Sequence, residues 1–143
     1  MKVACIARRG ETLPEEYLNA RLNLKRETDF HLTVGKEYVV YAVAIRSQQV
    51  WYYVVDDDNL WFPIYKPAPL FKSVDDRVSQ HWRVKLTPGN LDHEVLLAFQ
   101  EWVSDDMFYE RLTDKQQAEV KVFKQRKQQM DEESEPSRGT APA

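Results

Sequence analysis

A block of aromatic and β-branched residues at positions 38–65 constrains the fold of this chain more than any other feature of its sequence. Polar, turn-forming residues interrupt the block twice, at positions 47–49 and 56–59. Short apolar runs separated by such turns are typical of consecutive antiparallel strands. The pattern therefore predicts a three-stranded meander, with strands at residues 37–45, 50–55 and 60–65. Pro63 lacks a backbone N–H, so the third strand is expected to lie at a sheet edge or to end there.

Three further segments extend the expected sheet. Residues 81–86 alternate strictly, which predicts that Trp82, Val84 and Leu86 face the core while the residues between them face solvent. Residues 3–7 have the composition of a short strand. Residues 94–103 have spacings that fit a helix and a strand equally well, and for the first half of this segment we favour the strand.

The pattern becomes helical in the last third of the chain. One short helix is expected near residues 107–112, and Thr113 followed by Gln116 is a capping-box arrangement that predicts the start of a second helix. Residues 131–143 contain no large apolar side chain, which predicts a disordered acidic and polar tail after a single β-rich domain at residues 1–130. The expected fold class is α+β, built as a small, strongly bent antiparallel β-sheet or an SH3-like barrel with one or two C-terminal helices.

Length and composition limit where such a chain can work. Its 143 residues are enough for one domain with a single core and too few for two. The first residues lack the continuous apolar segment of a signal peptide, and no uncharged stretch approaches the roughly 20 residues that cross a bilayer. We therefore expect a cytoplasmic protein that does not bind membranes. The single cysteine, Cys5, excludes an intrachain disulfide, and its apolar surroundings predict a buried, inert thiol.

Acidic residues are concentrated between Thr87 and Asp114, where seven carboxylates accompany one base, Arg111. Phosphate contacts need clustered lysine and arginine, so this distribution disfavours nucleic-acid binding and favours a basic protein partner. The aromatic residues of the strands are expected to form the core on one face of the sheet. On the other face they could form a protein-binding patch, and stacking of single-stranded bases is a third interpretation.

The sequence contains no motif typical of a catalytic or metal site. Asp56, Asp57 and Asp58 are adjacent, whereas a calcium-binding loop alternates its ligands and contains a glycine. The three histidines lie far apart, and the four glycines form neither a phosphate-binding loop nor a dinucleotide fingerprint. We expect no metal, no cofactor and no enzymatic activity. The aspartate triplet is either a solvated turn or a contact for a basic partner.

A succession of core and turn residues runs through most of the chain: Leu32, Val34, Gly35, Lys36, Tyr38, Val40 and Tyr41, then Tyr53, Val55, Asp56 and Asp57, then Trp61 and Pro63, then Pro67, Ala68, Leu70, Phe71, Val74 and Asp75, then His81 and Trp82, and finally Phe108, Tyr109, Leu112, Asp114 and Phe123. Between residues 32 and 127 this succession resembles the small bacterial immunity proteins that are encoded beside polymorphic or contact-dependent toxins.

The resemblance implies a stoichiometric inhibitor that binds a cognate toxin domain without catalysis, and the expected candidate partner is a basic toxin domain encoded by a neighbouring gene. Immunity proteins vary at the surfaces that bind their toxins, so the candidate contacts come from the charge pattern instead. Two alternatives remain open: a small regulatory or scaffold module that binds a peptide through its sheet edge, and a hydrolase-like enzyme with a site assembled from unlinked residues. The candidate partner contacts are Asp56, Asp57, Asp58, Glu101, Asp105 and Asp106.

Overall fold

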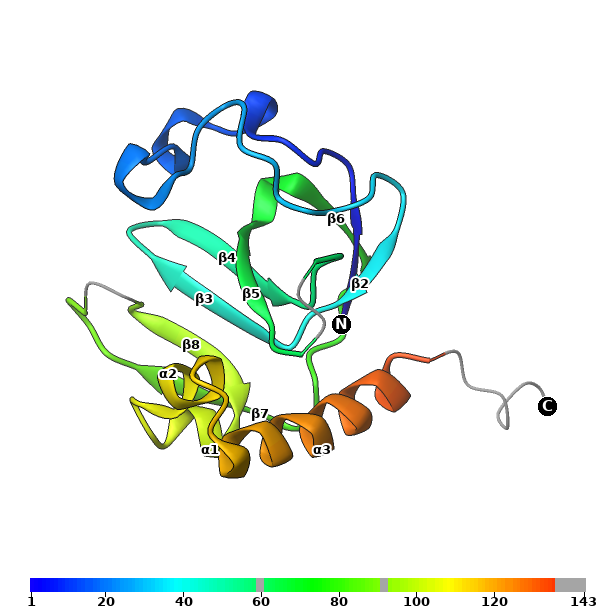
Figure 1. Ribbon diagram of the computed structural model, residues 1–143, viewed down its shortest axis with the longest axis vertical. Helices are drawn as coiled ribbons and strands as arrows, with labels where there is room; N and C mark the ends of the chain where they lie inside the picture. Colours follow the sequence, from blue (N-terminus) through cyan, green and yellow to red (C-terminus); the bar gives the residue numbers. More distant parts are fainter. Residues whose placement is uncertain (59–60, 91–92, 136–143) are drawn as a thin grey trace.

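The computed structural model describes residues 1–58, 61–90 and 93–135 and shows an α+β fold, in which strands of two antiparallel sheets precede three α-helices (Figure 1). The smaller sheet has the strand order β2-β1-β6, and the larger has the order β5-β4-β3-β8-β7. The strands are β1 (Lys2–Cys5), β2 (Glu37–Val39), β3 (Ala42–Arg46), β4 (Gln49–Val54), β5 (Ile64–Pro67), β6 (Phe71–Asp75), β7 (Trp82–Leu86) and β8 (Val95–Phe99). The α-helices are α1 (Gln100–Val103), α2 (Phe108–Thr113) and α3 (Gln117–Glu133).

The expected fold class is confirmed. Of its two forms, the structure has strongly bent open sheets, because the strand pairing of the described residues does not close into a barrel. No helix in the described ranges is both long enough and apolar enough to span a bilayer.

The chain passes from the smaller sheet to the larger one at Val40 and Tyr41. The amide of Val40 donates to the carbonyl of Met1 at 3.1 Å, whereas the amide of Tyr41 donates to the carbonyl of Tyr53 at 2.9 Å. Consecutive amides therefore bond to strands of different sheets. The single strand expected at residues 37–45 is for this reason two strands, β2 and β3, and the apolar side chains on both of its faces serve two sheets.

The predicted meander is confirmed as β3, β4 and β5. Ser47 and Gln48 form the first turn with positive φ angles of 50° and 67°, as in the tight turns that match the twist of a hairpin. Strand β5 begins only at Ile64, immediately after Pro63, and it lies at an edge of the larger sheet as expected. Residues 59–60, predicted in the second turn and at the start of this strand, lie outside the described residues.

Strand β7 confirms the strand predicted at residues 81–86, but the prediction that Trp82, Val84 and Leu86 all face the core is wrong. Trp82 is buried, whereas Val84 and Leu86 are 60% and 66% exposed. Strand β7 lies at the edge of the larger sheet opposite to β5, and the protein core covers only its first residue. The ambiguous segment at residues 94–103 contains both structures, with β8 followed directly by α1. Strand β6, which pairs with β1, was not predicted.

The second helix is confirmed as α3, but the prediction that Thr113 and Gln116 form a capping box at its start is wrong. The Thr113 hydroxyl donates to the carbonyl of Glu110 at 2.9 Å, and α3 begins at Gln117 after Gln116, whose side chain makes no capping hydrogen bond. Phe123 of α3 contacts Tyr41, with the two rings edge-on and their centroids 5.6 Å apart. This contact attaches α3 to the junction between the two sheets.

The prediction of a disordered tail from residue 131 is wrong for its first part. Helix α3 continues to Glu133, and the Asp131 carboxylate accepts a 2.6 Å hydrogen bond from the hydroxyl of Tyr41. Ser134 is buried and its hydroxyl lies 3.4 Å from the N-terminal ammonium group. Met130 is the last large apolar side chain that α3 buries, and beyond it the contacts are polar, which is why the composition from residue 131 onward did not reveal the end of the helix. Residues 136–143 lie outside the described residues.

Candidate functional site

One face of the larger sheet carries large aromatic side chains beside small ones. Trp51 of β4 is paired with Ala44 of β3, and Ala44 is paired on its other side with Leu96 of β8. Tyr53, two residues beyond Trp51, is paired with Tyr65 of β5. Directly paired residues and residues two apart share one face of a sheet. Because alanine lies opposite tryptophan, the row has space beside the indole ring.

The α1–α2 segment forms the opposite wall. Trp102 and Tyr109 stack with their ring centroids 5.3 Å apart and their planes at 12°, and Tyr53 meets Trp102 edge-on at 4.9 Å. The Tyr109 hydroxyl donates to the carbonyl of Pro63 at 2.6 Å. Burial raises the pKa of Tyr109 far above its ordinary value, so this phenol remains a neutral hydrogen-bond donor. The wall is therefore fixed at several points.

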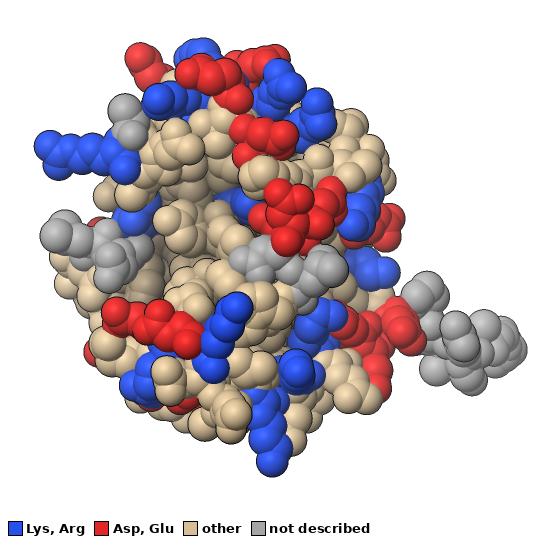
Figure 2. All heavy atoms as spheres, in the orientation of Figure 1, with Lys and Arg blue, Asp and Glu red and all other residues tan. Residues whose placement is uncertain are grey.

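Between sheet and wall lies a cavity of about 470 Å³, which we call the aromatic cleft. In Figure 2 the molecule is hollowed between its upper part and the lower part that contains α2, with acidic and basic side chains along the lower edge. Concave sites with aromatic walls and a few polar groups are the usual form of ligand and anchor pockets. The cleft is lined by Ala44, Arg46, Trp51, Tyr53, Tyr65, Lys85, His93, Leu96, Trp102, Asp105, Asp106, Met107, Tyr109, Glu110 and Thr113.

The carboxylates on the α2 side of the cleft differ in their partners. Asp105 forms an ion pair with Arg111, and Asp106 forms one with Lys85. The backbone N–H of Met107, assisted by Arg111, holds the pKa of Asp105 below its ordinary value, so Asp105 is ionised at neutral pH. Glu110 is exposed and forms no ion pair with any residue of the described ranges. It is the carboxylate of the cleft most readily available to a partner.

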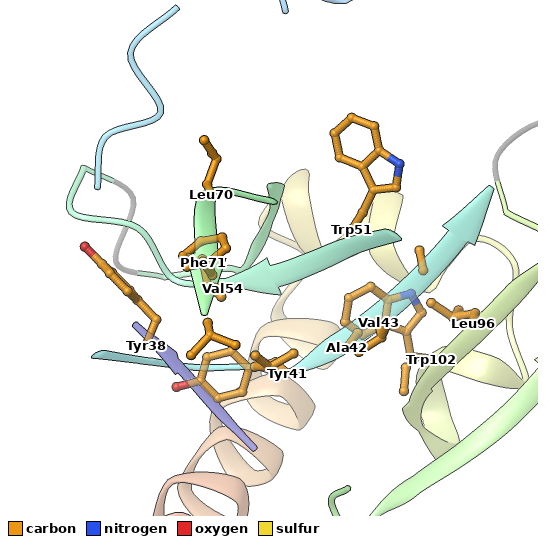
Figure 3. Close-up of a cluster of buried hydrophobic side chains, with 14 of the residues drawn as sticks. Tyr38, Tyr41, Ala42, Val43, Trp51, Val54, Leu70, Phe71, Leu96 and Trp102 are labelled. Carbon is orange, nitrogen blue, oxygen red and sulfur yellow. The ribbon is translucent and has the colours of Figure 1, made fainter. Parts of the chain in front are cut away.

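The β3–β4 side of the cleft holds two donors, Trp51 and Arg46, that find no acceptor among the described residues. Trp51 is 3% exposed, and its indole N–H has no hydrogen-bond acceptor among the residues that the structure describes. A buried donor left in this state costs about 1–3 kcal/mol. The guanidinium of Arg46 lies 5.4 Å from the centre of the Trp51 ring and, within the same part of the chain, forms no ion pair. In Figure 3 the indole nitrogen is on the side of the ring nearer to Leu96 and Trp102.

Asp56 was expected on the binding surface, and the structure corrects this. Its side chain is 2% exposed and forms a 2.8 Å ion pair with Lys66, which is itself 6% exposed. The other oxygen of Asp56 accepts the backbone N–H of Asp58 at 3.0 Å. Asp56 therefore fixes the end of β4 to β5, and a partner could reach it only if this buried pair opened.

The remaining predicted acids also have partners within the chain. Asp57 binds the Lys36 ammonium at 2.7 Å and accepts hydrogen bonds from Thr33 and Tyr38, which ties its loop to the start of β2. Asp58 lies 2.7 Å from the His31 ring, and Glu101 lies 2.9 Å from the guanidinium of Arg126. The six candidates do not form one acidic patch. Of these acids, the structure brings only Asp105 and Asp106 to the aromatic cleft.

Sequence reasoning placed Trp51, Tyr53 and Tyr65 among aromatics that form either core or a binding patch, and here they line the aromatic cleft, with Trp51 buried and Tyr65 exposed. It missed Arg46 and the space beside Ala44. The alternation of alanine at positions 42 and 44, opposite Tyr53 and Trp51, was the available signal. Recognising it required the register of the hairpin.

In residues 1–58, 61–90 and 93–135, no group of three or more histidine, cysteine, aspartate or glutamate side chains is arranged to hold a metal ion. Cys5 is buried, as predicted, and burial raises the pKa of its thiol.

Comparison with known proteins finds no protein family whose pattern matches this chain, no curated protein that matches it and no solved structure that matches it.

Proposed function

We propose that this chain is a cytoplasmic, stoichiometric protein-binding inhibitor of the immunity type, whose toxin partner covers the aromatic cleft. The aromatic cleft is the observation that carries the proposal. Tyrosine and tryptophan are preferred anchors at interfaces because they bury a large area with little loss of conformational entropy. Tyr65, at 38% exposure, is available on the cleft wall to such a partner.

The charges around the cleft suit a basic partner. Glu110 has no ion-pair partner among the described residues and can meet a cation directly, while Asp105 and Asp106 can exchange Arg111 and Lys85 for a partner's cations. Exchange of one cation for another keeps each carboxylate paired throughout binding. Complementary charges at a rim mainly accelerate association. The acids expected at the 56–58 turn are omitted from this surface because they brace the fold.

Calorimetry with the toxic domain encoded beside this chain tests the proposal. We expect a one-to-one complex, and co-expression should restore growth to cells that express the toxic domain. Glu110→Gln should slow association by about two- to tenfold with little change in dissociation, because rim charges act on encounter. Glu27→Gln removes the same charge from another exposed position and should have no effect. Absence of a complex, or equal association rates for the two variants, would reject the proposal.

The edge of the larger sheet supports a second candidate, a module that binds an extended peptide. Val84 and Leu86 are exposed on β7, which is the outer strand. An added strand could pair with this edge and cover both side chains. Val84→Lys should abolish peptide binding at this edge, whereas binding at the aromatic cleft should remain unchanged.

A further inference from the structure

We infer that the aromatic cleft binds a carboxylate attached to an apolar body of aromatic size, with the indole N–H of Trp51 and the guanidinium of Arg46 as its two donors. This inference goes beyond the proposed function, because it specifies a ligand chemistry and does not require a toxin partner.

Trp51 provides the first donor of the proposed site. Its indole N–H can only donate, and the residues in the described ranges provide no acceptor although the side chain is 3% exposed. Buried polar groups are nearly always hydrogen-bonded in folded proteins. The indole nitrogen lies on the side of the ring nearer to Leu96 and Trp102, which line the cleft, but its surface is covered, so a ligand oxygen completes this hydrogen bond with a small shift of the side chains around it.

Arg46 provides the positive charge of the proposed site. Lys85 of β7, which also lines the cleft, is already paired with Asp106. Arg46 instead lies over the Trp51 ring, at 5.4 Å from its centre, and pairs with no carboxylate of the described residues. An amide oxygen would satisfy the indole alone. A carboxylate satisfies both groups, because guanidinium and carboxylate match in geometry and charge.

The shape and lining of the remaining cavity determine the body of the ligand. The rings of Tyr53, Tyr65, Trp102 and Tyr109 line the remaining cavity, whose volume of about 470 Å³ lies in the range of small-ligand pockets. Offset and edge-on contacts with these rings favour a flat apolar group. The nearby carboxylates of Asp105 and Asp106 are neutralised by their own partners, so among the described acids of the cleft Glu110, which is exposed to solvent, is the one left to repel a bound anion.

The same chemistry has two possible sources, a free small acid or the C-terminal residue of a peptide. N-acetylphenylalanine represents the free acid, and its amide has the same body without the charge. A tetrapeptide of three glycines and a C-terminal phenylalanine represents the chain end. Binding of each probe is measured by calorimetry, and the Trp51 indole N–H is followed by NMR, with Trp51→Phe to assign its signal.

We expect a carboxylate probe to bind about 10- to 100-fold more tightly than the amide and to shift the Trp51 indole signal. Arg46→Gln should remove this preference, whereas Arg83→Gln, an exposed position on β7 outside the cleft, should keep it. Equal affinity for acid and amide, an unchanged indole signal, or no binding of either carboxylate probe at about 10 mM would overturn the inference.

The two probes separate the sources. Binding of N-acetylphenylalanine as tight as that of the tetrapeptide identifies a free acid as sufficient, and a clear advantage of the tetrapeptide identifies a chain end. Failure here is distinguishable from failure of the proposed function. A toxin complex that forms equally with wild type and Arg46→Gln, in the absence of probe binding, would reject only this inference.

Discussion

The ammonium group of Lys66 lies 2.8 Å from the carboxylate of Asp56, and both side chains are almost completely withdrawn from solvent. A charge buried without its counterion is strongly destabilising, so the pair joins β5 to the loop after β4 only while both members are present. The aspartate that the sequence suggests as a surface contact is thus part of the structural framework behind the aromatic cleft.

Replacement of this aspartate gives the first prediction. Asp56→Asn should lower the free energy of unfolding by about 3–5 kcal/mol, because Lys66 remains buried without a counterion. Urea denaturation measures the change. Asp58→Asn is the control, since its pair with His31 is exposed and should contribute less than about 1 kcal/mol. Similar losses in both variants would show that the Asp56 pair is not buried as described.

The acid limb of stability should depend on Asp57. Burial alone would raise the pKa of Asp57, but its hydrogen bonds from Lys36, Thr33 and Tyr38 outweigh burial and hold the pKa below its ordinary value. A pKa lowered by folding stabilises the protein above the unfolded value of about 3.9, and this contribution disappears as pH falls through the folded value.

Urea unfolding of Asp57→Asn between neutral and acid pH measures this effect. The variant should be less stable than wild type at neutral pH, and the difference should shrink as the pH falls below about 4. Asp76→Asn removes an exposed carboxylate elsewhere on the surface and should leave the slope of the acid limb unchanged. A constant difference between Asp57→Asn and wild type at every pH would contradict the assignment.

The C-terminal turn of α3 should contribute to stability through the hydrogen bond from Tyr41 to Asp131. Tyr41→Phe should lower the free energy of unfolding by about 1–2 kcal/mol, because it removes the donor and keeps the ring contact with Phe123. Truncation after Met130 should destabilise the protein at least as much. A chain that ends at Glu135 keeps every contact described above and serves as its control. Equal melting temperatures for the two truncated chains would reject this role.

Gly10 should not tolerate a side chain. A Cβ atom at this position would fall well inside van der Waals contact with the carbonyl oxygen of Lys25, and backbone atoms cannot move aside easily. Gly10→Ala should lower the free energy of unfolding by about 1–3 kcal/mol. Gly35→Ala provides a contrasting control, because its Cβ would meet open space and its cost comes only from the positive φ of 89°. Wild-type stability of Gly10→Ala would contradict the close approach.

Local patterns in the sequence predicted much of the sheet. Alternation and turn residues located β3, β4 and β7, since these depend on neighbouring residues. The break between β2 and β3 could not be predicted this way, because it depends on hydrogen bonds that the amides of Val40 and Tyr41 donate to the carbonyls of Met1 and Tyr53. The exposure of Val84 and Leu86 was missed for the same reason, as alternation cannot show where a sheet ends.

The candidate site shows a similar limit. Composition identified the acidic residues but not their partners, and the distances to Lys66, Lys36 and Arg126 show that charges counted along a chain need not form a surface. The aromatic residues were recognised as anchors or core. Their arrangement into a cleft depends on the pairing of Trp51 with Ala44 and on the position of Trp102 in the opposite wall. Both are features of the tertiary structure that the sequence pattern does not show.

Hydrogen–deuterium exchange on a complex with the proposed partner, a toxic domain from a neighbouring gene, tests the central proposal that a protein partner covers the aromatic cleft. The claim predicts slower exchange on binding for the backbone between Trp102 and Glu110, which forms the outer wall of the cleft, with little change at β7. Slower exchange confined to β7, or anywhere that excludes the cleft wall, would contradict it.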